Sequence, residues 1–350
     1  MHPNLSFDQA PPIGVPLRFL LTAPWFGVAA GLLLAWSGEV AVLSRWTPQA
    51  LALTHLLVAG FLLQAMTGAL FQFVPVAAGG NVWRPRLAAA IIHPMYIAAT
   101  ALLVAGFLAA NGSLLRLAAG LFLPTVLLHV ALVGSALLRT PARGATIAAL
   151  RVAVAGLAVT VVLGASLAEG IAGSHAWPLV QVTNVHAAWG LGALVIAGTF
   201  VSLINGMMYK IVPFLCWLHL QRQAGIGGTV AWWLGALVIA GTFVSLINGM
   251  MYKIVPFLCW LHLQRQAGIG GTVPNMREIA PERAQRLQLR LHFASVTLLL
   301  LATFYAEVLV AAGAAFAASC AWLGWNLIDA VRRYQGFRNR AGAGAAGREP

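Results

Sequence analysis

Residues 50–76 read ALALTHLLVAGFLLQAMTGALFQFVPV, an apolar run that contains no Asp, Glu, Lys or Arg. A helix rises about 1.5 Å per residue, so this run is long enough to cross the roughly 30 Å hydrocarbon core of a bilayer. We therefore expect a transmembrane helix here. Similar runs recur along the chain, and we predict spans near 17–37, 50–76, 87–109, 115–138, 147–168, 184–215, 231–258, 290–308 and 310–330.

The composition excludes a water-soluble globular protein. Of the 350 residues, 60% are apolar and only 8% are charged, whereas about 25% of a soluble domain is charged. The net charge of +13 comes from arginines that lie between the apolar runs, not from one basic patch. We therefore expect the lipid bilayer, and no nucleic acid, as a partner. Three cysteines without a CxxC pair predict neither a disulfide framework nor a cysteine metal site.

Arginines gather at alternate connections between the predicted spans. Arginines precede the first span, follow the second span and follow the fourth span. They also precede the penultimate span and follow the last one. Cytoplasmic loops of membrane proteins are enriched in Lys and Arg, so this alternation predicts a multi-pass protein with its N-terminus inside. Arg outnumbers Lys by 19 to 2, which is typical of a GC-rich bacterial genome and favours a bacterial cytoplasmic (inner) membrane. The arginines in question are Arg18, Arg84, Arg86, Arg139, Arg143, Arg277, Arg283, Arg286, Arg290, Arg332, Arg333, Arg338, Arg340 and Arg348.

A block of 43 residues occurs twice in tandem, at 188–230 and 231–273, and the copies differ only at Gly190 and Trp233. A second spanning copy would move the later arginines to the outer side, against the positive-inside bias. We therefore predict that one copy does not span as a normal helix, or that the chain is an altered form of a 307-residue, eight-span parent.

A second, older repeat relates two of the predicted spans. His55 precedes Gly68 and His186 precedes Gly206, and each glycine begins the sequence G-x-x-[FY]-x-x-V-P. The glycine follows the histidine by 13 residues in one span and by 20 in the other. The difference of seven is about two helical turns, so the histidines lie on similar faces. Each span is second in a group of four, which predicts two parallel four-helix units with both histidines near the outer surface.

The stretch THLLVAGFLLQAMTGALFQFVPV, together with NVHAAWG and NGMMYKIVPF, resembles the histidine-bearing helices of the haem-copper oxidase catalytic subunit (subunit I), especially its nitric-oxide-reductase branch. That family is built from three four-helix units whose second helices carry metal-ligating histidines. The resemblance implies an all-α polytopic membrane bundle of eight ancestral transmembrane helices in two four-helix units, plus one duplicated helix. It also implies haem as a cofactor, with His55 and His186 holding the iron. The chain contains no HH and no HxH, so we do not expect copper or binuclear-centre catalysis.

The expected domain organisation follows from these spans. An N-terminal cytoplasmic segment covers 1–16, and the first four-helix unit covers 17–138. The second unit covers 139–330 and includes the duplication and an interfacial loop at 274–290. A basic cytoplasmic tail covers 331–350.

Histidine inside a membrane is costly to bury, and the neutral imidazole is a common axial ligand of haem iron. His55 and His186 are therefore the main cofactor candidates, with His129 and His93 as further candidates. The alternative is that each histidine only bonds a neighbouring helix.

The predicted function is haem binding in electron transfer or in nitrogen-oxide or oxygen metabolism, beside other respiratory membrane subunits or a redox partner. The alternative is a membrane transporter, or an assembly or accessory protein of a respiratory complex, whose histidines are structural. A third interpretation is that the duplication has left a non-functional product. No phosphate loop, H-E-x-x-H motif or nucleophile elbow occurs, so we assign no catalytic residue.

Overall fold

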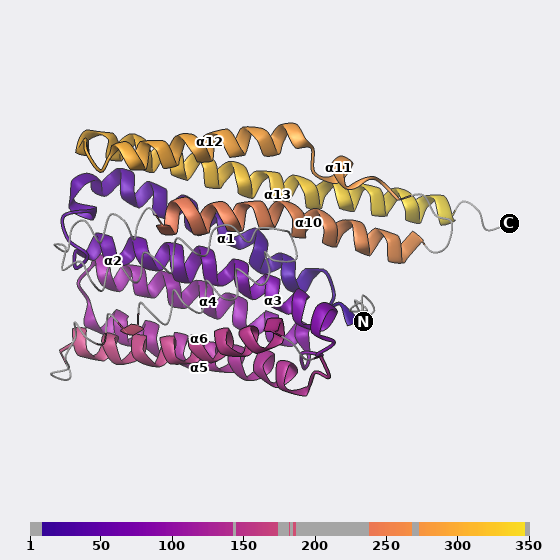
Figure 1. Cartoon of the computed structure of the whole chain (residues 1–350), viewed down its shortest axis with the longest axis horizontal. Helices are drawn as coiled ribbons and strands as arrows, with labels where there is room; N and C mark the ends of the chain where they lie inside the picture. The colour runs from indigo at the N-terminus through magenta and orange to yellow at the C-terminus, as the bar shows by residue number, and fades with distance from the viewer. Residues whose placement is uncertain are drawn as a thin grey trace.

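The computed structural model of the chain describes residues 9–142, 145–173, 182, 185, 186, 238–267 and 273–346, and within these ranges it contains helices and turns but no strand (Figure 1). Seven described helices are long and apolar enough to cross a membrane. The prediction of a polytopic, all-helical membrane bundle is therefore confirmed. These candidate spans are Gly14–Ala41, Pro48–Val76, Pro85–Leu108, Gly112–Arg139, Thr146–Ile171, Ile239–Gln266 and Ala306–Arg340.

The helices have the following bounds. The long rods are α1 (Gly14–Ser37), α2 (Pro48–His55) continued by η3 (Leu56–Leu62) and α3 (Leu63–Ala78), α4 (Pro85–Leu108), α5 (Gly112–Arg139), α6 (Ala145–Ile171), η5 (Val238–Phe243) continued by α10 (Val244–Ala267), α12 (Glu282–Leu301) and α13 (Leu309–Ala346). The short helices are η2 (Gly38–Ala41), α11 (Met276–Ile279) and η6 (Ala306–Val308).

Successive rods run in opposite directions (Figure 1). One end of the bundle, which we call the basic end, holds residues 79–84, 140–142 and 273–281. The other end, which we call the opposite end, holds residues 38–47 and 302–308. The arginines that were expected to share one side, apart from Arg143 and Arg348 outside the described residues, lie on rods that start or finish at the basic end. Arg290 also lies on such a rod, α12, but it is farther from the basic end than Arg283 and Arg286 of the same helix.

The rod of α2, η3 and α3 is the centre of the bundle and its most buried span. One face of this rod packs with α10, α12 and α13 in an apolar core that includes Phe61, Met66, Phe243 and Met251. Another face packs with α1, α4, α5 and α6 in a second core around Phe71. Helices α12 and α6 lie at the two edges, against α13 and α5 respectively (Figure 1).

The closest helix crossing joins α1 to α13. Small residues recur every fourth position on α1, at Gly27, Gly31 and Ala35. Gly27 faces Cys320 of α13, whereas Gly31 and Ala35 face Gly313 and Ala317 of that helix. A Cβ added to Gly31 would lie 2.5 Å from the backbone nitrogen of Ala317. Such small-residue stripes let helix backbones approach closely, which is how membrane helices gain packing energy without a hydrophobic driving force.

The two rods that share the G-x-x-[FY]-x-x-V-P sequence also share an unusual backbone. The π-helix η3 ends at Leu62, six residues before Gly68, and the π-helix η5 ends at Phe243, six residues before Gly249 of the second tandem copy. Most π-helices are single turns, and they are frequent at functional sites. The repeat found in the sequence is therefore accompanied by a repeated π-helix in the structure. The sequence pattern did not predict this π-helix.

The second tandem copy forms η5 and α10, whereas the first copy, 188–230, and most of the predicted span 184–215 lie outside the described residues. Helix α6 ends at the opposite end, and α10 starts there and finishes at the basic end (Figure 1). Arg277 therefore lies at the same end of the bundle as Arg84, as the alternating arginine pattern requires.

Deletion of residues 188–230 tests whether one copy is enough. The described contacts between the duplicated sequence and the rest of the bundle are made by the second copy, which the deletion keeps. We therefore expect the 307-residue chain to stay folded. Its midpoint of thermal unfolding in detergent should change by no more than roughly 2–4 °C, which corresponds to about 1 kcal/mol for a chain of this size. A shortened chain that aggregates, while the full chain stays monodisperse, would contradict this expectation.

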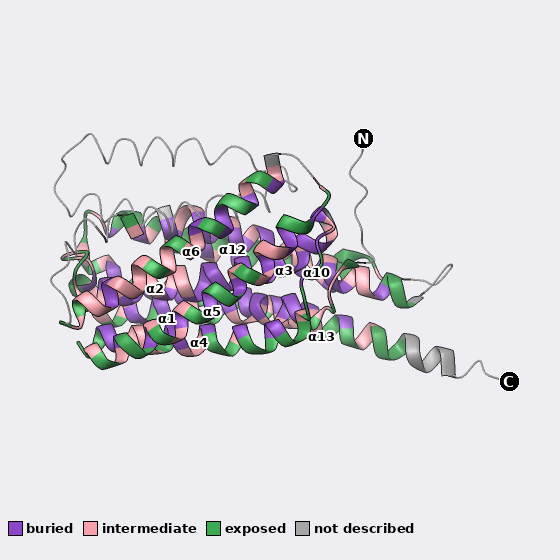
Figure 2. Ribbon diagram, turned by 90° about the horizontal axis from the view of Figure 1, so that it is seen from below, coloured by how far each residue is buried: buried purple, intermediate pink, exposed green. Residues whose placement is uncertain are grey.

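Two boundaries differ from those predicted. Helix α12 begins at Glu282, so residues 282–290, expected as an interfacial loop or short helix, form the first part of a long helix. This helix ends at Leu301 and includes part of the predicted span 290–308, but it is not among the seven candidate spans. This helix packs along α13, and its Gln288 donates a hydrogen bond to Ser319 of that helix. Helix α13 continues into the expected tail as far as Ala346, extending past the rest of the bundle (Figures 1 and 2).

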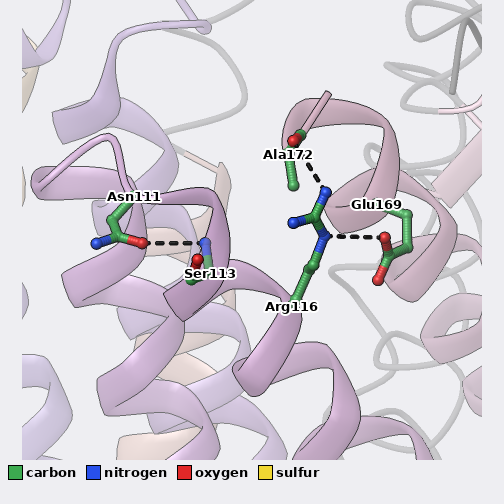
Figure 3. A network of polar contacts seen from close by, with 5 residues as sticks. All are labelled: Asn111, Ser113, Arg116, Glu169 and Ala172. Atoms are coloured by element: carbon green, nitrogen blue, oxygen red, sulfur yellow. Dashed lines mark hydrogen bonds and ion pairs between the residues drawn. The ribbon is translucent and has the colours of Figure 1, made fainter. Parts of the chain in front are cut away.

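Polar contacts link α5 and α6 at the opposite end (Figure 3). Asn111 caps α5, because its Oδ1 accepts from the backbone N–H groups of Ser113 at 3.0 Å and Leu114 at 3.1 Å. Arg116 donates to a carboxylate oxygen of Glu169 at 3.2 Å and to the carbonyl of Ala172 at 3.1 Å. The ion pair is exposed, and such pairs contribute little to stability.

We therefore expect the cap to matter more than the ion pair. Asn111→Ala should lower the free energy of unfolding by about 1 kcal/mol, because two N-terminal amides of α5 lose their acceptor. Glu169→Gln should change it by less, since exposed pairs are worth about 0–1 kcal/mol. Thermal unfolding in one detergent compares the two variants. A larger loss for Glu169→Gln would show that the ion pair holds the two helices together.

Candidate functional site

His55 is the last residue of α2 and lies directly before the π-helix η3. Thr47 starts α2 by accepting a hydrogen bond from the amide of Ala50, and Pro48 occupies the first turn. The imidazole Nδ1 of His55 donates to the carbonyl oxygen of Leu51 at 2.7 Å. A carbonyl oxygen only accepts, so Nδ1 carries the hydrogen, and Nε2 of the neutral ring carries the lone pair.

His186 comes from the chain beyond α6 and packs against that helix. Its Nδ1 donates to the carbonyl oxygen of Thr160 at 2.9 Å. Its ring lies over Gly164, where an added Cβ would be 2.9 Å from the imidazole Cε1. The ring therefore has the same tautomer as His55 in the neutral state, with its lone pair on Nε2. Gly164 provides the space that the ring occupies.

His55 and His186 are near enough for the charges of their imidazoles to interact. The ring of Phe107 lies 5.1 Å from that of His55 at an angle of 34°. An apolar cluster that includes Leu53, Leu56, Phe107 and Ala168 joins α2, η3, α4 and α6 at this level. The pair therefore lies in an apolar part of the bundle, toward the opposite end.

This arrangement suits the ligation of a metal centre. Metal-bound histidines usually donate their second ring N–H to a carbonyl or carboxylate, which fixes the ring and its tautomer. Both His55 and His186 make such a bond to a backbone carbonyl. Each leaves Nε2 as the nitrogen that can bind iron. Two imidazoles from separate segments of the chain match the two axial positions of a haem.

His129 lies elsewhere, at a contact between α4 and α5. It is 1% exposed, and its Nδ1 shares a hydrogen bond of 2.9 Å with the hydroxyl of Tyr96. The ring of Phe71 stacks on it at 5.8 Å with an angle of 11°. Its Nε2 has no hydrogen-bond partner among the described residues. The structure therefore places His129 in a separate buried polar site, away from the pair.

His93 is held in a third place, near the basic end of α4. Its Nε2 shares a hydrogen bond of 2.8 Å with the hydroxyl of Thr22 in α1. The ring of Phe19 meets the imidazole edge to face at 5.1 Å and stacks on Phe71 at 5.7 Å. These contacts give His93 a role in packing α4 against α1.

Sequence reasoning missed a set of buried polar side chains on α3 and α4, the helices that supply the His129 contacts Phe71 and Tyr96. Gln64, Thr67 and Thr100 are fully buried, and their amide and hydroxyl atoms have no described hydrogen-bond partner. Gln64 and Thr67 share a helix face with Phe71, since they are seven and four residues before it. The signal available in the sequence was the recurrence of polar residues, such as Gln64 and Thr67, on one face of an otherwise apolar span.

The described residues contain no group of three or more His, Cys, Asp or Glu side chains that could hold a metal ion. The candidate site is thus a pair of histidines. No protein-family model matches the chain, and no curated protein matches it. The resemblance to haem-copper oxidases remains a prediction from the residues quoted above.

Proposed function

We propose that this chain is a haem-binding integral membrane protein related to the catalytic subunit of haem-copper oxidases. His55 and His186 would hold the iron through their Nε2 atoms. A bound haem would supply one-electron transfer, in electron transport or in nitrogen-oxide or oxygen metabolism. The supporting observation is that both imidazoles are fixed by Nδ1 hydrogen bonds to backbone carbonyls within charge-interaction distance of each other.

The architecture proposed for this function is a parent of eight transmembrane helices in two four-helix units, plus one duplicated helix. The matched π-helices before Gly68 and Gly249 support the repeat. The arginines at the basic end support a bacterial inner-membrane protein with this end and the N-terminus in the cytoplasm. His55 and His186 would then lie in the outer half of the bilayer, where a redox partner or another respiratory subunit can approach.

The protein itself contributes position and environment. The carbonyl oxygens of Leu51 and Thr160 place the hydrogen of each neutral ring on Nδ1, which leaves the lone pair on Nε2, and they set the orientation of the rings. Phe107 and the apolar cluster around it give this level of the bundle an apolar surrounding. An apolar surrounding of this kind governs solvent access and the reduction potential of a metal centre.

A reduced-minus-oxidised visible spectrum of the detergent-purified full chain tests the proposal. Cells should be grown with ample haem, and the 307-residue chain lacking 188–230 should be measured beside it. Sharp haem bands in either chain support the proposal, and bands in the shortened chain alone show that the duplication disrupts the site. A monodisperse preparation of both chains without haem would overturn it.

A second candidate function is a membrane transporter whose histidines are structural or bind a transported solute. The buried and unpartnered polar atoms of Gln64, Thr67, Thr100 and His129 favour it, because polar groups inside a membrane mark solute and ion pathways. Solute uptake by proteoliposomes that contain haem-free protein, lost in a Thr67→Val variant, would favour this function over haem binding.

A further inference from the structure

Three arginines share one exposed face of α12. Arg283, Arg286 and Arg290 recur at intervals of three and four residues, so they lie above one another along the helix. With Leu287 they surround a shallow hollow of about 320 Å³. The other face of α12, which carries Gln288, packs against α13, and the exposed positions appear green in Figure 2.

Helix α12 is not itself among the candidate spans, but its register against α13 places this face at the depth of those spans. Gln288 donates a hydrogen bond to Ser319, and the next residue, Cys320, faces Gly27 of α1. Gly27 is midway along the candidate span Gly14–Ala41. Arg290 lies two residues beyond Gln288, about 3 Å farther from the basic end. Its Cα is therefore near the middle of the bundle's membrane-spanning thickness.

Such a position is unfavourable for an arginine that faces lipid. Charged side chains in transmembrane segments almost always face a protein interior or an aqueous cavity and pair with another group. Arg283 is about 10 Å nearer the basic end than Arg290, so its long side chain can extend toward the headgroups. Arg290 is too deep for that. Its exposed face therefore requires a partner that carries negative charge inside the membrane.

The chain itself does not supply this charge among its described residues. Glu282 pairs with Arg286 at 3.6 Å and with Arg277 at 3.2 Å, and neither Arg283 nor Arg290 forms an ion pair with a described carboxylate. Residues 174–237 contain no Asp or Glu. The remaining described acidic residues lie near the ends of the bundle, and they are Glu39, Glu169, Glu278, Glu307 and Asp329.

We propose that this face of α12 docks a transmembrane helix of a second polypeptide that carries Asp or Glu at the depth of Arg290. A lipid phosphate would remain at the headgroup level, well below Arg290. A second copy of this chain would bring no carboxylate to that depth. Exposed apolar side chains accompany the arginines along α12, including Leu287, Leu289, Phe293 and Leu300. A face that combines apolar contact with buried charge pairing suits a helix.

Photo-crosslinking in native membranes tests the proposal. The full chain carries benzoylphenylalanine at Leu287, and a control chain carries it at Val159, an exposed position on α6. We expect an adduct of discrete mass from position 287 only. Mass spectrometry of the adduct should identify a transmembrane segment with an internal Asp or Glu.

Charge reversal then tests the pairing itself. Arg290→Glu should reduce the adduct by at least about tenfold, because removing one member of a desolvated charge pair costs more than one tenfold step in affinity. Changing the partner's carboxylate to Arg should restore the adduct. Arg338→Glu, on the exposed end of α13, is the matched control and should leave the adduct unchanged.

Three results would overturn the proposal. One is an adduct with lipid only, which would show that phospholipid covers this face. The others are a partner segment without an acidic residue, and an unchanged adduct in Arg290→Glu. If Arg290→Glu fails to fold, the neutral Arg290→Gln variant replaces it, with the same expected direction. The readout does not depend on haem, so its outcome is separate from that of the proposed function.

Discussion

Purified His55→Ala and His186→Ala proteins are each expected to lose the reduced-minus-oxidised haem bands. Each change removes one of the two proposed iron ligands, and alanine offers no lone pair in its place. The haem content per chain, measured after extraction into alkaline pyridine, should therefore fall to near zero in both variants. The two histidines come from different helices, so an equal loss in both would identify them as a pair.

Two further variants separate ligation from folding. His262→Ala removes another histidine of the bundle, one whose Nδ1 shares a hydrogen bond of 2.8 Å with the Tyr334 hydroxyl, and it should keep the full haem content. Gly164→Leu leaves both ligands in place but fills the space under the His186 ring. It should lower the haem content, whereas Gly120→Leu should not, since nothing lies within 4 Å of a Cβ at Gly120.

The pattern of losses decides between interpretations. Loss of haem in His55→Ala alone would show that His186 is structural and that another residue is the second ligand. Loss in His129→Ala, with the bands of His186→Ala intact, would move the site to the contact between His129 and Tyr96. Retention of the bands in both His55→Ala and His186→Ala would overturn the assignment.

Gly31→Leu is expected to have the largest effect on stability. A Cβ at Gly31 would lie 2.5 Å from the backbone nitrogen of Ala317 and 2.7 Å from the carbonyl oxygen of Gly313. Backbone atoms cannot move aside by changing rotamer, so α1 and α13 must separate. Overpacking usually costs about 1–3 kcal/mol, and we expect a loss at or above the upper end of this range.

Thermal unfolding of the detergent-solubilised protein measures this effect, at roughly 2–4 °C per kcal/mol for a chain of this size. Gly120→Leu on α5 is the matched control, because it adds the same side chain where nothing lies within 4 Å. Equal unfolding temperatures for the two variants would show that the crossing of α1 and α13 does not determine stability.

The sequence was sufficient to predict seven of the nine spans, because their signal is local; 290–308 is not among the candidate spans, and 184–215 lies almost wholly outside the described residues. An apolar run of about 20 residues must cross the bilayer as a helix, whatever its neighbours. The predicted spans 50–76 and 115–138 thus correspond to Pro48–Val76 and Gly112–Arg139. The start of α12 was missed for the opposite reason. Residues 282–290 carry arginines typical of an interfacial segment, and the sequence holds no local signal for the contact of Gln288 with Ser319 of α13.

The histidine pair was predictable in part. Matching positions before a shared motif predicted that His55 and His186 act together, and this stays a prediction; the structure adds that the charges of their imidazoles are near enough to interact. The bonds that fix their rings were not predictable, because Thr160 is 26 residues from His186 in the chain. The separate positions of His93 and His129 were also not predictable from the sequence, because their hydrogen-bond partners Thr22 and Tyr96 lie on other helices.

The sequence by itself determined that the protein is a helical membrane bundle, and it predicted the side preferred by its arginines, because hydrophobic length and charge act on each segment separately. Only the tertiary structure decided which helices touch. It brought Gly31 against Gly313 and placed Arg290 of α12 beside the middle of the spans. Contacts of this kind depend on packing between segments far apart in the chain, and a repeating apolar pattern carries no information about its partner.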